Sequence, residues 1–179
     1  MIGAIIGSAA LGVAAMVGIA GYYAVTDEDD DEDNDEGDRA AVARALRFAK
    51  VTLQQGLTAS ELEGHPISAK FEVDRGKFQL SVYTWKDGRF SEVLVDYSTG
   101  DIMKAQPITQ GNDLDVAQAQ HEAMTKAKIG LREAVDRTLV DAAGFRAVAV
   151  VPNLKDGRAV ASVLLFKGED SKIVNQTLD

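Results

Sequence analysis

Few residues of this sequence have the types and spacing needed for acid–base or metal chemistry. The two histidines, His65 and His121, are far apart, and neither has a second histidine at metal-ligand spacing. The zinc-protease motif His-Glu-x-x-His, the phosphate loop, the dinucleotide-binding glycine motif and the serine-hydrolase motif Gly-x-Ser-x-Gly do not occur. Carboxylate pairs are abundant, but their spacing selects none as an acid and a base. We therefore expect a protein that is not an enzyme and holds no cofactor or metal, with both histidines at or near the surface.

The densest group of candidate ligands is the acidic run over residues 27–38. A calcium loop needs glycine at its sixth position and a carboxylate at its twelfth. Counted from Asp31, this sequence has Glu36 and Val42 there, which leaves only diffuse cation binding. Because like charges repel and nothing apolar can be buried, residues 26–38 are predicted to form a disordered, extended linker.

Charge outside the acidic run is balanced. The formal net charge is -9, but ten of the 28 acidic residues belong to the run, so 18 acids face 19 lysines and arginines elsewhere. No basic stretch interleaved with aromatic residues is present, which argues against a nucleic-acid partner. The absence of cysteine excludes disulfides and thiolate metal sites.

The first 25 residues predict a segment that enters a membrane. Residues 2–25 contain no charge, and as a helix they would extend about 36 Å, enough to cross a bilayer. This length and the adjacent Tyr22 and Tyr23 favour an uncleaved anchor. The small residues ending at Ala20 instead permit cleavage as a signal peptide. Both alternatives predict export.

A helical pattern begins after the acidic run. Apolar residues recur at three- and four-residue steps over residues 42–57, with Asp38 placed to cap the helix. Gly56 interrupts the pattern, and Thr58 with Glu61 could form a new capping box. The pattern therefore fits either one helix as far as residue 63 or two shorter helices.

Alternating apolar residues and short turns then predict an antiparallel sheet with the helix on one face. The expected strands are residues 67–73, 78–82, 93–95 and 101–108. A second helical pattern covers residues 115–142, and strand patterns return at residues 145–151, 158–167 and 172–178. The order of helix and strands thus occurs twice.

The two halves also match in sequence. Residues 76–93 align without a gap on residues 157–174, with five identities. Because the identities fall in the same predicted context, they indicate an internal duplication. We expect one unit over residues 39–110 and a second over residues 111–179.

Four large side chains form the candidate partner surface: Tyr83, Trp85, Leu164 and Phe166. Tyr83 and Trp85 project from their strand on the side opposite the predicted core residue Leu80, and the other two are their aligned counterparts. If both units share one sheet, the four could form an exposed apolar patch that binds a protein. The alternative is that they close the seam between the units.

The segment VDYSTGDI, residues 95–102, resembles the V-D-x-x-T-G-[ED]-[IV] ending of PepSY domains. Asp96 and Thr99 can hydrogen-bond the turn backbone, and Gly100 supplies a positive φ. The resemblance covers residues 38–108, and the second half would be a degenerate unit without this motif. It implies an α+β fold: tandem helix-plus-antiparallel-sheet, PepSY-like repeats behind an N-terminal hydrophobic helix.

The PepSY resemblance also implies a function and a location. PepSY units are associated with propeptides of thermolysin-like metallopeptidases and are thought to restrain peptidases or bind other exported proteins. We therefore expect a non-catalytic protein-binding module, anchored to the membrane or secreted, on the periplasmic or extracytoplasmic side of a bacterial cell envelope. One alternative is a self-associating structural or sensory envelope protein. A small-ligand carrier would need an empty pocket between helices and sheet.

Overall fold

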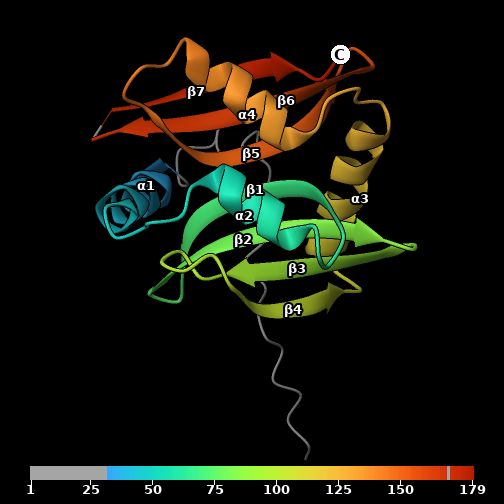
Figure 1. Cartoon of the computed structure of the whole chain (residues 1–179), viewed down its shortest axis with the longest axis horizontal. Helices are drawn as coiled ribbons and strands as arrows, with labels where there is room; N and C mark the ends of the chain where they lie inside the picture. Colours follow the sequence, from blue (N-terminus) through green and yellow to red (C-terminus); the bar gives the residue numbers. More distant parts are fainter. Residues whose placement is uncertain (1–31, 169) are drawn as a thin grey trace, which may run out of the picture.

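The computed structural model describes residues 32–168 and 170–179. Within these residues the chain is α+β, with four helices and one seven-stranded antiparallel sheet (Figure 1). The predicted N-terminal hydrophobic helix, residues 1–25, lies outside the described residues. None of the described helices has the length and apolar character needed to cross a membrane.

The element order shows two helices followed by strands, twice. The first half contains α1 (Glu32–Leu46), α2 (Leu53–Ser60), β1 (His65–Asp74), β2 (Lys77–Lys86), β3 (Arg89–Val95) and β4 (Ile102–Ile108). The second half contains α3 (Asn112–Thr125), α4 (Leu131–Val140), β5 (Arg146–Lys155), β6 (Arg158–Lys167) and β7 (Asp170–Thr177). The strand order is β4-β3-β2-β1-β5-β6-β7, so β1 and β5 join the halves at the centre of one sheet.

The first helical pattern forms two helices rather than one. Thr52 caps α2: its hydroxyl accepts a hydrogen bond from the Gln55 backbone N–H, and the Gln55 side chain accepts one from the Thr52 backbone. This capping box satisfies backbone donors that the start of a helix would otherwise leave unpaired. The predicted box at Thr58 and Glu61 does not form, because Thr58 lies inside α2 and Glu61 is its C-cap.

The start of α1 corrects the predicted linker. Residues 32–38 are helical, whereas the sequence predicts disorder over residues 26–38, and Asp38 lies within α1 rather than at its cap. Acidic residues in the first turns of a helix interact favourably with the helix dipole, an effect that the repulsion argument omits. The remaining linker residues, 26–31, lie outside the described part of the chain.

The second helical pattern is also divided, into α3 and α4. The connection between them is held by the C-terminal residues, since the backbone N–H groups of Lys128 and Ile129 both donate to the Leu178 carbonyl. The strands predicted for the second half correspond to β5, β6 and β7, and β4 confirms the fourth strand predicted for the first half.

Irregular features of the sheet recur at matching positions of the two halves. A β-bulge at Ile67 in β1 has a counterpart at Val148 in β5. The hairpin that follows each bulged strand turns at a glycine with φ of 76°, Gly76 in one half and Gly157 in the other. Bulge and turn are separated equally in both halves, so the register of each hairpin is the same.

The connections between helices are anchored alike in both halves. The Tyr97 carbonyl accepts hydrogen bonds from Lys50 and Val51 between α1 and α2. The Leu178 carbonyl takes the same role between α3 and α4. Tyr97 and Leu178 follow their hairpin glycines by the same number of residues.

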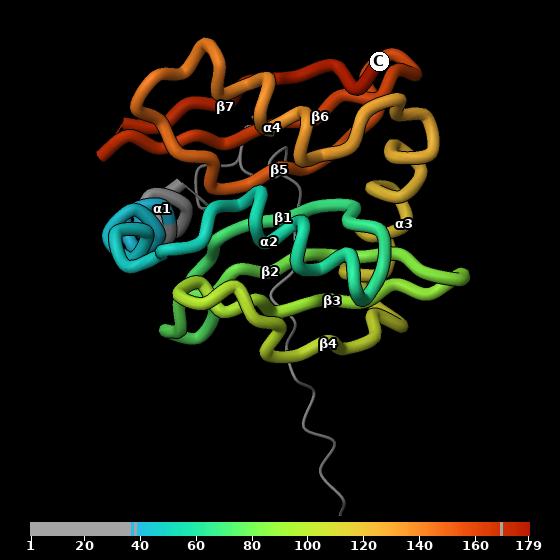
Figure 2. Tube along the Cα trace, in the orientation of Figure 1, coloured from blue at the N-terminus to red at the C-terminus, as the bar shows by residue number. Residues whose placement is uncertain are grey.

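Helices cover both faces of the sheet. In Figure 2, α2 and α4 lie side by side in front of the sheet, while α1 and α3 lie at opposite sides of the molecule. Leu53 of α2 belongs to the same core cluster as Val82, whereas Tyr83, which points to the opposite face, clusters with Ala117 of α3. The sequence predicts helices on one face of the sheet only, and this prediction is wrong for α3, which packs on the opposite face. The chain leaves the sheet at edge strand β4 and must cross it to reach the central strand β5.

Candidate protein-binding interface

The four residues of the candidate partner surface do not form an exposed patch. Tyr83 is fully buried, Leu164 and Phe166 are 6% and 5% exposed, and Trp85 is half-buried. The sequence pattern shows correctly that Tyr83 and Trp85 point away from Leu80. What it does not show is that a later helix covers that side of the sheet.

The alternative, that these side chains close the seam between the units, agrees with the contacts. The Tyr83 hydroxyl donates to Asp113 Oδ1 of α3 at 3.2 Å, and the Trp85 ring stacks on His121 of α3 at 4.5 Å between centroids. A helix of the second half therefore packs on a strand of the first. Leu164 and Phe166 are buried in the main core, which also contains Val42 and Leu46 of α1.

The two histidines meet at this seam. His121 lies on α3 between Trp85 and Phe90, with ring centroids 4.5 Å and 5.8 Å away. Its pKa is lowered mainly by burial and further by the nearby charge of His65. His121 therefore packs as a neutral aromatic side chain near neutral pH, while His65 is exposed at the start of β1. Within the described residues, no group of three or more His, Cys, Asp or Glu could hold a metal ion.

The PepSY-like motif forms the turn between β3 and β4. Asp96 Oδ1 accepts hydrogen bonds from the backbone N–H groups of Ser98 (2.7 Å) and Thr99 (2.9 Å), and these bonds lower the pKa of Asp96. Thr99 Oγ1 accepts one from the Asp101 backbone, and Gly100 has a φ of 84°. All three motif residues thus have the backbone roles expected for them, and the motif is structural.

A buried carboxylate that no sequence pattern singled out lies on the sheet face that carries Tyr83. Glu92 is 2% exposed and accepts hydrogen bonds from Ser81 Oγ and Gln106 Nε2, each at 2.6 Å. Burial raises the pKa of Glu92, and the charges of Glu72 and Asp113 add to the increase, while the two hydrogen bonds oppose it. Both of its oxygens are used by neutral partners of the same sheet. Alternation along β3 could have placed Glu92 on this face, but not shown that the face is covered.

The exposed site best suited to a protein partner lies beside the end of α1. An open groove of about 340 Å³ runs between α1 and the hairpin that joins β1 to β2. We call it the basic groove, and its lining residues are Ala41, Arg44, Ala45, Arg47, Phe48, Val73, Gly76 and Phe78. Among the described residues that line it, all are apolar apart from the two arginines, and none is acidic.

The floor and rim of the basic groove have different properties. Phe78 forms part of the floor and is fixed by ring contacts with Phe71 at 5.6 Å and with Tyr97 at 5.0 Å. At the rim, Phe48 is 59% exposed and the Arg47 guanidinium lies 4.7 Å from its ring centroid. Phenylalanine and arginine are both enriched at protein interfaces relative to the rest of the surface, so this pair is a candidate contact for a partner.

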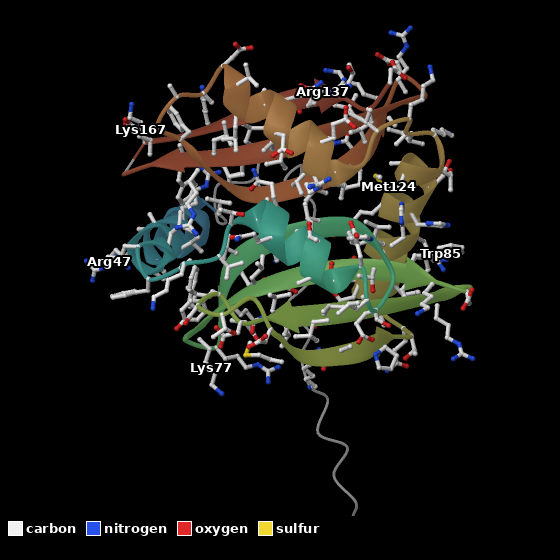
Figure 3. The ribbon with its side chains drawn as sticks, in the orientation of Figure 1. Arg47, Lys77, Trp85, Met124, Arg137 and Lys167 are labelled. Atoms are coloured by element: carbon white, nitrogen blue, oxygen red, sulfur yellow. The ribbon has the colours of Figure 1, made fainter. Side chains whose placement is uncertain are left out.

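Two further cations are sequence neighbours of a residue that lines the basic groove. Arg75 and Lys77 flank its lining residue Gly76 in the β1–β2 turn, and Figure 3 shows Arg47 and Lys77 on the same side of the molecule. Arg75 also contacts Asp74 at 4.0 Å. A ligand that carries several negative charges would match these cations, and one that also carries an apolar side chain would in addition contact Phe48.

A second hollow, of about 210 Å³, is less specific. It lies between α2 and α4, and its lining includes His65 and the charged residues Glu61, Arg132 and Glu133. Since acids and bases both line it, its electrostatics favour neither anions nor cations. It is also smaller than the usual pocket for a drug-sized ligand.

Comparison with known proteins gives no assignment. No family model matches the chain, and neither a curated protein nor a solved structure is significantly similar to it.

Proposed function

We propose that this chain is a non-catalytic protein-binding module of the bacterial cell envelope, held at the membrane or secreted through residues 1–25. The observation that carries this proposal is the basic groove, where the exposed Phe48 and two arginines surround an aromatic floor. The arrangement offers anchoring contacts for a protein segment and no reacting group.

The scaffold of this module is proposed to be a pair of PepSY-like units related by duplication. The bulges at Ile67 and Val148 and the turns at Gly76 and Gly157 support duplication, because each recurs at the same position of its unit. The hydrogen-bonded turn at Asp96 supports the PepSY resemblance of the first unit.

The expected partner is an exported protein, in the PepSY analogy a peptidase that the module restrains. The basic groove would take an acidic segment with one large apolar side chain, which would pack between Phe48 and Phe78. Such binding would occupy a segment of the peptidase without any chemistry by the module.

The experiment compares capture of envelope proteins by three full-length chains that carry a C-terminal affinity tag. The groove variant is Arg47→Glu with Phe48→Ser. The control is Met103→Ser with Lys104→Glu on β4, an apolar and cationic pair that is also exposed, with Met103 at 54%, and that does not line the groove. Circular dichroism would establish that both variants remain folded.

The proposal expects one protein to be retained by the native chain and the control and lost from the groove variant. Once purified, that protein should bind the groove variant at least about tenfold more weakly, a difference of about 1.4 kcal/mol. If it is a peptidase, only the native and control chains should slow it. Equal retention by all three chains would show that the groove is not the binding site, and retention of nothing would contradict the binding function.

A further inference from the structure

We propose that the basic groove binds the acidic run, residues 27–38, of a second copy of this chain. The inference rests on the proposed function, because it takes the basic groove as a protein-binding site and names what occupies it. It predicts that the module associates with itself when the groove holds no other partner.

The sequence contains two regions of complementary charge. The acidic run contains ten carboxylates and no base, while the remainder of the chain is nearly neutral, with 18 acids and 19 bases. Against this balanced background, Arg44 and Arg47 line the basic groove, and Arg75 and Lys77 stand beside it. The largest concentration of negative charge in the sequence therefore matches a local concentration of positive charge.

The acidic run cannot readily occupy the groove of its own chain. Residues 32–38 belong to α1, the same helix that carries Arg44 and Arg47, so they cannot fold back against it. Residues 27–31 span at most about 17 Å when extended. Arg44 lies about 18 Å along the helix from Glu32, at about 1.5 Å per residue, so a chain of that length falls just short of it even after a complete reversal of direction. A second copy has no such restriction.

The order of charges along α1 also fits a symmetric pair of chains. Acidic residues occupy its N-terminal part, and arginines 44 and 47 lie at or just after its C-terminal end. Two copies of α1 in antiparallel orientation would place the acidic part of each beside the arginines of the other. This contact is isologous and closes at a dimer, so it does not propagate into a filament.

The test uses full-length chains in mild detergent and two complementary variants. The groove variant carries Arg44→Glu and Arg47→Glu. The run variant replaces all ten acids of residues 27–38 by their amides, which preserves side-chain shape. The control variant carries Lys104→Glu and Lys128→Glu, which make the same charge change at exposed positions elsewhere. Molar mass is measured by light scattering over a range of concentrations.

We expect the native and control chains to dimerise and each of the two other variants alone to remain monomeric. A mixture of the groove variant and the run variant should form a heterodimer, because one supplies the acidic run and the other the intact groove. Raising the salt concentration from about 0.05 M to about 0.5 M should weaken association about tenfold or more, since the screening length falls to a few ångströms.

A labelled peptide of residues 26–38 provides a second measurement. It should bind the run variant, and a run variant that also carries Arg44→Glu and Arg47→Glu should bind it at least about tenfold more weakly. An amide version of the peptide should not bind. The inference is overturned if the native chain is monomeric or if the groove variant and the run variant each still dimerise alone. It is also overturned if the peptide binds equally well with and without Arg44 and Arg47.

These outcomes also separate the inference from the proposed function. If a purified envelope protein needs Arg47 and Phe48 while the native chain stays monomeric, the groove binds a foreign partner and the proposed occupant is wrong. If the variants complement each other but no envelope protein is captured, the self-association is correct and the foreign partner is wrong.

Discussion

Replacing Arg146 should separate the two halves of the protein more effectively than any other single polar substitution on their common sheet. Arg146 lies at the start of β5, yet its guanidinium donates to three carbonyls of the α1–α2 connection: those of Leu46 (3.1 Å), Ala49 (2.9 Å) and Val51 (2.6 Å). The guanidinium also lies 5.5 Å from the Phe71 ring centroid. One side chain of the second half thus fixes a loop of the first.

The expected loss of stability follows from these contacts. Hydrogen bonds from a charged donor each contribute about 1.5–3 kcal/mol, and their sum is an upper bound. Arg146 is half-buried, and this desolvation of its charge lowers its pKa, so removing the charge recovers part of the desolvation cost. For Arg146→Met we expect a decrease of about 3–4 kcal/mol in the free energy of unfolding. Arg146→Lys keeps the charge but loses the planar fork of donors, and should cost about 1–2 kcal/mol.

Urea unfolding of the full-length chain, followed by circular dichroism, measures both losses. Arg158→Met is the matched control, because Arg158 occupies the start of the next strand and is exposed. It should change the free energy of unfolding by no more than about 0.5 kcal/mol. If Arg146→Met costs no more than Arg158→Met, the three hydrogen bonds do not hold the halves together and the reasoning is refuted.

Two further predictions concern the core and a buried charge. Gly56→Ala would place a Cβ atom 2.2 Å from Leu80 Cδ2. Overpacking of about 1–3 kcal/mol should exceed the gain of about 1 kcal/mol in helix propensity, so the melting temperature should fall. The control Gly37→Ala, whose Cβ would have no atom within 4 Å, should not lower the melting temperature. The raised pKa of Glu92 means that the folded state binds its proton more tightly than the unfolded state. Its contribution to stability is therefore complete below the ordinary pKa and is lost as pH rises through the raised value. The free energy of unfolding, measured across this pH range, should show that loss in the native chain and not in Glu92→Gln. If the native chain and the variant lose stability in parallel as pH rises, the pKa of Glu92 is not raised in the folded state.

Local patterns were sufficient to predict most of the elements. Alternation and hairpin turns located the strands, and the gapless alignment of residues 76–93 on residues 157–174 matches hairpins with the same turn geometry. Helix boundaries were less accurate, because capping depends on which hydrogen bonds form. Thr52 and Gln55 fit the capping-box pattern as well as Thr58 and Glu61 do, and only the packing of α2 selects between them.

The candidate site could not be predicted because it depends on contacts between distant segments. Periodicity correctly placed Tyr83 opposite Leu80, but whether that face is open depends on the path of the chain from β4 to β5. The basic groove joins residues at the end of α1 to the β1–β2 hairpin, and Phe48, which lies just beyond α1, has no place in the predicted helical pattern that would mark it. The available signal was the grouping of arginines 44 and 47 after the acidic run.

The residues that join the two halves differ from the exposed residues Arg44, Arg47 and Phe48 of the basic groove, and this difference makes the proposals testable. Seam residues such as Tyr83 and Arg146 are buried or half-buried and bonded across the two halves, so their substitution changes stability. The side chains of Arg44, Arg47 and Phe48 are exposed, and such substitutions usually change stability by no more than about 0.5 kcal/mol. Loss of binding at unchanged stability therefore identifies the groove as the interface, whereas loss of binding together with stability identifies a defect of the seam.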